Sequence, residues 1–192
     1  MPRSRPVANK NSLRIIAGTW RSRRLQFKDS PKIRPTPDRV RETLFNWLAE
    51  HVDQAKCLDL FAGSGALGFE SVSRGASSAL LIENDEKIAA QLMQQKQCFK
   101  ADTIEIKQQS AVSFLQTNQQ QFDLVFLDPP FDSPLLEQVL PLIHEKQLLS
   151  ANGLLYIESS SMQDAMHSLE TLECIREKVA GEVRYALYRQ SS

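Results

Sequence analysis

The chain has 192 residues, of which 42% are hydrophobic and 24% charged, and this composition excludes a disordered, collagen-like or coiled-coil protein. A chain of this length buries roughly 70% of its unfolded surface, so it needs neither a disulfide nor a structural metal to hold a core. Residues 1–47 carry 12 lysines and arginines against 3 acidic residues, a net charge of +9, whereas the remaining 145 residues carry 11 against 20, a net charge of −9. A basic segment on an acidic body predicts an element that binds a polyanion, and a solubilising tail is the alternative.

The cysteines and the apolar runs indicate the compartment. Cys57, Cys98 and Cys174 lie far apart and form no C-x-x-C pair, which favours reduced thiols over a zinc or redox site. No apolar run approaches the roughly 20 residues of a membrane helix, and no apolar stretch follows the charged N-terminus. We therefore expect a cytoplasmic protein with no membrane segment and no metal.

The basic segment begins with a polar, proline-containing arm over residues 1–12. Two short strand-like runs, Leu13–Gly18 and Arg23–Lys28, then predict a hairpin. Its tip would expose Trp20 beside arginines, so that the indole stacks on a base while guanidinium groups contact phosphates. A tryptophan packed against the body of the protein is the alternative.

A helix should follow the hairpin. Thr36 and Pro37 have the pattern of an N-cap and a first helical residue, and apolar residues then share one face to about His51. Arg39 and Arg41 lie in the first turn, where cations interact unfavourably with the helix dipole. Their position indicates an external anion or a nearby acidic side chain.

From residue 57 apolar strands alternate with helical segments, which predicts a parallel sheet covered on both faces. A final hairpin of residues 172–179 and 183–188 breaks the alternation and predicts an antiparallel end to the sheet. We divide the chain into an arm at 1–12, a basic hairpin and helix at 13–52, and a larger α/β domain at 53–192. The expected strands are 57–61, 79–82, 103–106, 124–127 and 154–157, and the expected helices are 66–74, 86–99, 111–118 and 134–146.

The segment Asp59–Gly68 contains glycines in G-x-G-x-x-G spacing between the first of these strands and a helix, where backbone amides can approach a ligand. Glu83 ends the next strand, at the place of a carboxylate that binds ribose hydroxyls. Both features suit a dinucleotide and an adenosyl cofactor equally. Asp59 favours the latter, because a carboxylate there would balance a cationic sulfonium and amino group; a carboxylate that binds loop amides is the alternative. Ser110 and Ala111 either contact adenine or cap a helix.

The tetrapeptide Asp128–Phe131 follows the strand that ends at Leu127, at the edge where open α/β sheets bind ligands. Two prolines remove two backbone donors and stiffen the loop, which leaves carbonyl acceptors. A carboxylate beside carbonyl oxygens suits a group with two N–H donors, such as the exocyclic amine of a base, and Phe131 can stack on that base. The alternative, a rigid acidic turn, does not explain the combination with the glycine loop.

The two motifs, Asp59–Gly68 and Asp128–Phe131, resemble those of class I S-adenosylmethionine-dependent methyltransferases that modify nucleobase amines. Three further segments, Ile16–Arg21, Arg34–Glu42 and Glu177–Gly181, make the resemblance closer. Over about residues 13–190 the chain resembles the bacterial RsmD family, the 16S ribosomal RNA (guanine(966)-N(2))-methyltransferases.

The resemblance implies a Rossmann-like α/β fold with a mostly parallel seven-stranded sheet, an antiparallel C-terminal hairpin and a small basic N-terminal hairpin and helix. It also implies S-adenosyl-L-methionine as cofactor and 16S ribosomal RNA in the small ribosomal subunit as partner, bound by a monomer without a metal. The residues that it implies are Asp128, Pro129, Pro130 and Phe131 for catalysis; Thr36, Asp59, Ala62, Gly63, Gly65, Gly68, Glu83, Asn84, Ser110 and Ala111 for the cofactor; and Trp20, Arg21, Arg23, Arg24, Arg34, Arg39 and Arg41 for RNA.

Three other functions remain open. A DNA adenine or cytosine amino-methyltransferase shares the Asp-Pro-Pro-aromatic element but usually has an added domain that reads sequence. An NAD(P)-dependent oxidoreductase would use the glycine loop and Glu83, yet leaves the tetrapeptide unexplained. A ribosome-assembly protein that binds RNA without catalysis would have no need of an intact Asp128.

Overall fold

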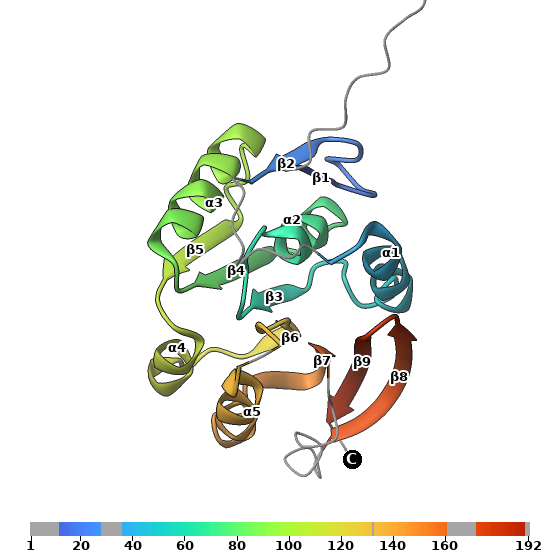
Figure 1. The fold of residues 1–192 in the computed structure, drawn as a ribbon, viewed down its shortest axis with the longest axis vertical. Helices are drawn as coiled ribbons and strands as arrows, with labels where there is room; N and C mark the ends of the chain where they lie inside the picture. Colours follow the sequence, from blue (N-terminus) through green and yellow to red (C-terminus); the bar gives the residue numbers. More distant parts are fainter. Residues whose placement is uncertain (1–11, 28–35, 132, 161–171, 191–192) are drawn as a thin grey trace, which may run out of the picture.

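The structure, a computed structural model, describes residues 12–27, 36–131, 133–160 and 172–190 (Figure 1). These residues form a two-stranded sheet and a seven-stranded sheet with five helices packed around them. In chain order the elements are β1 (Ser12–Arg14), β2 (Arg24–Gln26), α1 (Asp38–Trp47), β3 (Lys56–Asp59), α2 (Ala66–Ser73), β4 (Ser78–Glu83), α3 (Glu86–Phe99), β5 (Ile104–Gln108), α4 (Ala111–Thr117), β6 (Phe122–Leu127), α5 (Leu135–Glu145), β7 (Leu149–Ser159), β8 (Leu172–Ala180) and β9 (Val183–Gln190).

The large sheet has the strand order β5-β4-β3-β6-β7-β9-β8. Its first five strands pair in parallel, whereas β9 pairs antiparallel with both β7 and β8. The chain winds outward from β3 in one direction to β5 and returns to β6 on the other side of β3. The predicted fold class is confirmed, and the reversal of direction between β3 and β6 creates the crevice in which such sheets bind ligands.

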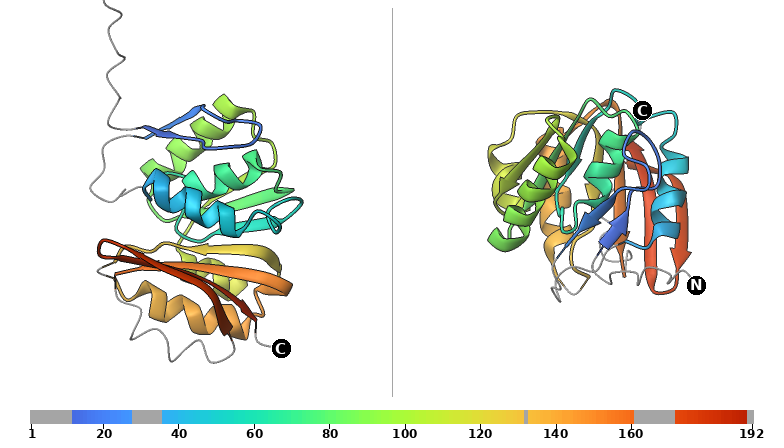
Figure 2. Two further views of the ribbon diagram at one scale, coloured as in Figure 1. Left: turned by 90° about the vertical axis from the view of Figure 1, so that its right-hand side faces the viewer. Right: turned by 90° about the horizontal axis from the view of Figure 1, so that it is seen from above.

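Two apolar cores lie on opposite faces of the sheet, because successive side chains of a strand point to opposite sides. Cys57 packs with residues of α1, α2 and α3, whereas its neighbour Leu58 packs with residues of α4 and α5. The left view of Figure 2 shows α1, α2 and α3 above β6 and β7, and α5 below these strands. The β1–β2 hairpin lies outside α2 and α3, so it adds a partial fourth layer to the three formed by the sheet and the helices on its two faces (Figure 1).

The strands and helices of the α/β region begin and end close to their expected positions, with one exception: β7 starts at Leu149, five residues earlier than expected. Leu149 pairs with Phe122 at the start of β6, which extends the parallel ladder. The first helix also differs. It begins at Asp38 and ends at Trp47, with Pro37 at the cap position and no side-chain cap. The predicted N-cap role of Thr36 is therefore wrong, and its hydroxyl is used elsewhere.

Within the described ranges, no helix combines the length and apolar character needed to cross a bilayer. Nor do three or more His, Cys, Asp or Glu side chains of those ranges gather in an arrangement suited to a metal ion.

Candidate active site

Four acidic side chains lie at the carboxyl ends of four neighbouring parallel strands. Glu83 and Asp59 are the last residues of β4 and β3, Asp128 follows the last residue of β6, and Glu158 is the penultimate residue of β7. The strands are adjacent in the order β4-β3-β6-β7, so these carboxylates form a row along the ligand-binding edge of the sheet.

The glycine loop leaves β3 and turns into α2. Gly63 and Gly65 have φ values of +49° and +76°, which favour glycine because a Cβ strains this region of conformational space. Glu83 accepts the N–H of Gly63 at 3.0 Å through one oxygen and the N–H of Asp85 at 2.8 Å through the other. Glu83 thus holds the loop against β4. Its predicted contact with ribose hydroxyls stays a prediction, which its remaining lone pairs permit.

Asp59 lies beneath this loop with 3% of its surface exposed. Burial raises the pKa of its carboxyl group to about 7, and the negative charges of Asp128 and Glu83 add to the shift, against hydrogen bonds from the amides of Phe61 and Gly68. Both of its sequence-based interpretations are therefore relevant, since the carboxylate accepts loop amides and also lies in an acid-rich surrounding where a bound cation would be stabilised.

The Asp-Pro-Pro-Phe segment forms a closed turn directly after β6. The carbonyl oxygen of Pro130 accepts both the N–H of Ser133 at 3.1 Å and its hydroxyl at 2.6 Å. Asp128 is partly buried, and its Oδ2 accepts the hydroxyl of Thr36 at 3.3 Å. Burial raises the pKa of Asp128 to about 6, and the hydrogen bond from Thr36 opposes this shift. The turn therefore holds, directly after the carboxyl end of β6, a carboxyl group whose pKa is raised.

Sequence reasoning missed Glu158. This side chain is 3% exposed, and Tyr156 donates its hydroxyl to Oε1 of Glu158 at 2.7 Å. Burial and the charge of Asp128 raise the pKa of Glu158 to about 8, against hydrogen bonds from Tyr156 and Thr36. The signal in the sequence was a glutamate at the end of an apolar strand, one place beyond the predicted strand end at Ile157. That this glutamate lies beside Asp128 follows only from the pairing of β7 with β6.

The other residues assigned to the cofactor lie at the same edge. Ala62 is buried, with its N–H bound to the carbonyl of Ile82, and Asn84 is exposed just after β4. Ser110 caps α4 by accepting the N–H of Ser113 at 3.1 Å. The structure thus shows the helix-cap role of Ser110, and a contact of Ser110 or Ala111 with adenine stays a prediction.

Arg41 corrects the predicted RNA surface. Its side chain has 0% exposure, and it donates to Oδ1 of Asp38 at 2.6 Å and lies 3.7 Å from Oε2 of Glu70. The buried Glu70 carboxylate also accepts Arg74 Nε at 2.7 Å and the backbone amides of Ile16 and Ala17. Arg41 therefore serves an internal acidic cluster, the alternative considered from the sequence, and the prediction that it binds RNA is wrong.

Trp20 is half-buried, with its ring packed against the body of the protein. Its ring centroid lies 6.1 Å from that of Phe69 in α2 and 5.3 Å from that of Phe99 in α3. The expected exposed stacking position of Trp20 is wrong, because burying the indole between two helices removes more apolar area from water than a solvated tip would.

The hairpin turn also lies far from Asp128. Gly18 and Thr19 contact Ser73 at the C-terminal end of α2, whereas α2 begins at the carboxyl edge of the sheet. The eight residues of α2 separate the two positions by ~12 Å at 1.5 Å per residue. Arg21 and Arg23 therefore project from the opposite end of the sheet from the acidic row, and the guanidinium of Arg23 lies 3.9 Å over the ring of Phe99.

Other arginines lie nearer the reactive edge. Arg39 is exposed in the first turn of α1, close in sequence to Thr36, and Arg14 and Arg24 are exposed cross-strand partners in the β1–β2 hairpin. Arg14 lies 3.9 Å from Asp38, which places this pair beside the start of α1. Arg34 lies outside the described residues, as does most of the 1–12 arm.

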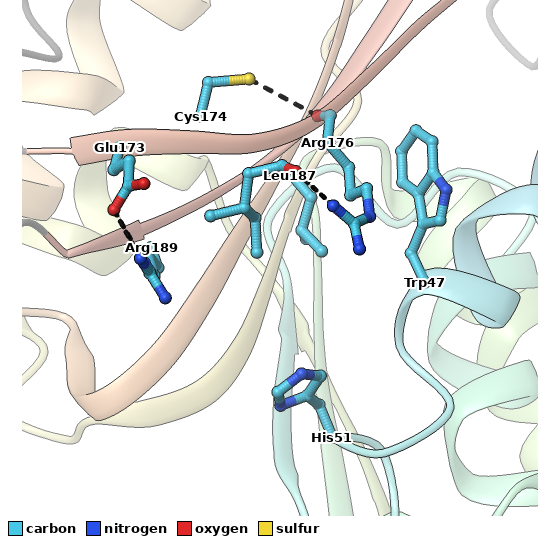
Figure 3. A pocket seen from close by; sticks show the side chains of 8 residues that line it. Trp47, His51, Glu173, Cys174, Arg176, Leu187 and Arg189 are labelled. Carbon is cyan, nitrogen blue, oxygen red and sulfur yellow. Dashed lines mark hydrogen bonds and ion pairs between the residues drawn. The ribbon is translucent and has the colours of Figure 1, made fainter.

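A pocket of about 410 Å³ lies elsewhere (Figure 3). Trp47 and His51, at the far end of α1 from Thr36, form one wall, and residues of β8 and β9 such as Arg176 and Arg189 form the other. Arg189 pairs with Leu154, near the amino end of the parallel ladder of β7, and forms an ion pair with Glu173 at 2.8 Å. This pocket is therefore separate from the row of carboxylates.

The chain is similar to known proteins over nearly its whole length. A family model described as "Conserved hypothetical protein 95" matches residues 13–189. Ribosomal RNA small subunit methyltransferase D of Escherichia coli K12 is 43% identical over 185 residues, which cover 96% of this chain and 93% of that protein. The protein of the same name from Haemophilus influenzae is 44% identical over 184 residues, covering 94% and 95%. The chain belongs to the RsmD family.

The solved structure of the Escherichia coli protein yhhF aligns with this chain with a TM-score of 0.85 at 43% identity, over 94% of this chain and 99% of that one. The aligned part of this chain includes its seven-stranded sheet, which ends in the antiparallel β8–β9 hairpin. In this RsmD family member, the glycine loop and the Asp-Pro-Pro-Phe turn follow the neighbouring strands β3 and β6 at the same edge of the sheet.

Proposed function

We propose that this chain transfers a methyl group from S-adenosylmethionine to the exocyclic N2 amine of one guanine of 16S ribosomal RNA, guanine 966 by family resemblance. We infer that it does so in the cytoplasm, as a monomer, on the assembled small-subunit particle. The observation that carries the proposal is the position of Asp128, at the end of β6 and beside the glycine loop, in a chain 43% identical to Ribosomal RNA small subunit methyltransferase D.

The residues of the crevice fit the cofactor. When bound, S-adenosylmethionine supplies an electrophilic methyl group next to a sulfonium cation. Asp59 is a buried carboxylate with a raised pKa, and a cation nearby would stabilise its charged form. Glu83 has free lone pairs for ribose hydroxyls while it holds the loop, and Gly63 and Gly65 allow close approach of the ligand to the backbone.

Asp128 would act on the amine. The lone pair of the guanine amine is delocalised into the ring, so the enzyme has to rotate or pyramidalise that group. The carboxylate of Asp128 and the carbonyl of Pro129 would accept its two hydrogens, direct the lone pair and stabilise the positive charge that develops on nitrogen. The amine then loses one proton to Asp128. Orientation of this kind can contribute ~7–11 kcal/mol to lowering the barrier.

The test is transfer of a labelled methyl group to small subunits that lack this modification, with naked 16S ribosomal RNA and duplex DNA as parallel substrates. We expect N2-methylguanosine, formed on the particle in preference to DNA. Asp128→Ala should reduce transfer by a factor of at least ~100 with cofactor affinity nearly unchanged, because a lost charge-stabilising group in an active site costs this much.

Other outcomes would replace the proposal. Label in adenine or cytosine of DNA would make the chain a DNA amino-methyltransferase. Tight binding of RNA without transfer would favour the ribosome-assembly function, and near-normal turnover by Asp128→Ala would remove Asp128 from the mechanism. Binding of NAD(P) at the glycine loop, with no methyl transfer, would favour the oxidoreductase.

A further inference from the structure

Two carboxyl groups on adjacent strands share one hydroxyl group. Leu127 pairs with Ile157 at the end of the β6–β7 ladder, so the next residues along each strand, Asp128 and Glu158, are neighbours. The Thr36 hydroxyl donates to Oδ2 of Asp128 at 3.3 Å, and it also lies close enough to the Glu158 carboxyl group to lower its pKa. Thr36 and Glu158 are both buried, so water cannot substitute freely for these contacts.

The hydrogens available to this group can be counted. A hydroxyl carries one hydrogen, and the hydrogen of Tyr156 is given to Oε1 of Glu158 at 2.7 Å. Thr36 can give its own hydrogen to one carboxylate at a time. If both carboxyl groups were ionised, neither could donate to Thr36, and one of its two contacts would lack a hydrogen. The chain of contacts is complete when one of the two carboxyl groups is protonated.

The surroundings decide which group holds that proton. Glu158 is 3% exposed, whereas Asp128 is partly open to the edge of the sheet. The groups that face Glu158 are Asp128 on β6, Asp59 on β3, Tyr156 on its own strand and Tyr185, its cross-strand partner on β9. Lys178 on β8 lies one strand further along this row and is exposed.

We propose that Glu158 is a positioning residue that carries the single proton of an Asp128–Thr36–Glu158 chain and so keeps Asp128 ionised and oriented toward the amine. Protonated Glu158 donates to Thr36, and Thr36 donates to Oδ2 of Asp128, which leaves Oδ1 for the substrate amine. This role rests on the proposed function. After methyl transfer, the proton lost by nitrogen goes to Asp128, the more exposed carboxyl group, and from there to solvent, which restores the starting state.

The pH dependence of transfer follows from this assignment. The active form needs Asp128 ionised and Glu158 protonated, so activity should rise through about pH 6 and fall through about pH 8. Above that limit two adjacent carboxylates compete for the hydrogen of Thr36. Because the two groups interact, these limits belong to the pair and not to one residue alone.

Glu158→Gln is the deciding variant, because an amide keeps a donor for Thr36 and an acceptor for Tyr156 but does not ionise. It should retain transfer within about threefold of wild type at pH 7 and lose the fall near pH 8. Glu158→Ala should lose about tenfold or more at pH 7, because the buried hydroxyl of Tyr156 loses its acceptor and that of Thr36 loses its donor. A change in rate that comes from the titration of guanine or of the cofactor would appear in the pH profiles of both wild type and Glu158→Gln, measured on the same substrate. A wild-type-like alkaline limit in Glu158→Gln would overturn the proposal.

A second measurement needs neither cofactor nor RNA. In the protein labelled with ¹³C at aspartate and glutamate carboxyl groups, nuclear magnetic resonance should show Glu158 protonated and Asp128 ionised at pH 7. Thr36→Val should raise the pKa of Asp128, since the hydroxyl donates to its charged form. Two ionised carboxyl groups at pH 7 would overturn the proposal. Correct titrations in a protein that transfers no methyl group would instead contradict the proposed function and confine the pair to a structural role.

Discussion

At the scale of single residues, this protein places acidic groups where their charged forms are costly. Asp59, Asp128 and Glu158 lie on three adjacent strand ends, and burial is the largest cause of the raised pKa of each. A carboxyl group whose pKa rises on folding binds its proton more tightly in the folded state, so stability falls as the pH rises from the unfolded pKa to the folded one. A cation bound at these strand ends would therefore stabilise the folded protein, because it favours the charged forms of the carboxyl groups.

Asp59→Asn tests this trade between stability and binding. The pKa of Asp59 rises from about 4 to about 7 on folding, so its cost is absent below pH 4, grows between these values and is complete above pH 7. The variant should therefore be more stable than wild type at pH 8 by about 1–3 kcal/mol and nearly unchanged at pH 4, by urea unfolding without cofactor.

The same variant should bind S-adenosylmethionine at least about tenfold more weakly at pH 8, because it loses a charged partner of the ligand. Isothermal titration calorimetry would measure this loss. Wild-type affinity should also increase as the pH rises through 7, and that dependence should disappear in Asp59→Asn. Unchanged affinity together with unchanged stability would show that the carboxylate serves the loop amides alone.

At the scale of elements, the N-terminal hairpin is attached to α2 through several short hydrogen bonds between its turn and Ser73. Ser73 accepts the N–H of Thr19 at 2.7 Å through its carbonyl and the N–H of Trp20 at 2.9 Å through its hydroxyl, which itself donates to the carbonyl of Ala17 at 2.6 Å. Glu70, one turn earlier, binds the amides before this loop. The two contacts lie on one side of α2 and fix the direction of the hairpin.

Gly18→Ala should release this hairpin. Gly18 has φ of +80°, and an added Cβ would lie 1.7 Å from the carbonyl oxygen of Ser73, so backbone has to move. We expect a loss of more than about 3 kcal/mol and faster hydrogen exchange at Ile16 and Ala17, since these amides lose Glu70.

Gly181→Ala is the matched control. Gly181 has φ of +63° in the β8–β9 turn, and its added Cβ would have no atom within 4 Å. This variant should cost about 1 kcal/mol from the backbone conformation alone. Equal destabilisation by the two substitutions would show that the hairpin is not held by its contact with Ser73.

At the scale of the whole molecule, charge is separated in space as well as in sequence. The acidic row faces the crevice, and the exposed arginines of the N-terminal segment lie in two groups: Arg14, Arg24 and Arg39 near the start of α1, and Arg21 and Arg23 at the opposite end of α2. If the proposed function holds, the first group lies nearer than the second to Asp128, because Thr36, just before α1, binds Asp128. We therefore expect the RNA-binding surface to follow the start of α1 and not the hairpin turn.

Replacing Arg24 and Arg39 together by alanine should weaken binding to naked 16S ribosomal RNA and reduce the slope of log affinity against log salt by about 1–2, because fewer counterions are released. Replacing Arg21 and Arg23 removes the same charge from the other end and is the control. We expect its salt slope to change less. Equal changes in both double variants, measured by filter binding at several salt concentrations, would contradict a surface centred on the crevice.

Local patterns were sufficient for the order of the elements. Strands and helices can be recognised from the spacing of their apolar residues, which repeats every 2 residues in a strand and every 3.6 in a helix. The α/β body and its terminal hairpin were therefore predictable from local sequence alone. The glycine loop and Asp128–Phe131 were also visible, because each is a contiguous motif next to a strand end. These two motifs indicated a class I methyltransferase, and the three further segments Ile16–Arg21, Arg34–Glu42 and Glu177–Gly181 indicated the family that the comparisons then confirmed.

Tertiary structure decided the roles that depend on residues distant in the chain. Arg41 and Trp20 were expected to face RNA, but Arg41 meets Glu70 across 29 positions and Trp20 meets Phe99 across 79, contacts that no local pattern contains. Thr36 and Glu158 acquire their relation to Asp128 because β6 and β7 pair and because the segment before α1 reaches the same edge. Periodicity determines which face a side chain takes, whereas the pairing of strands determines its neighbours, and the charge state of a buried group depends on its neighbours.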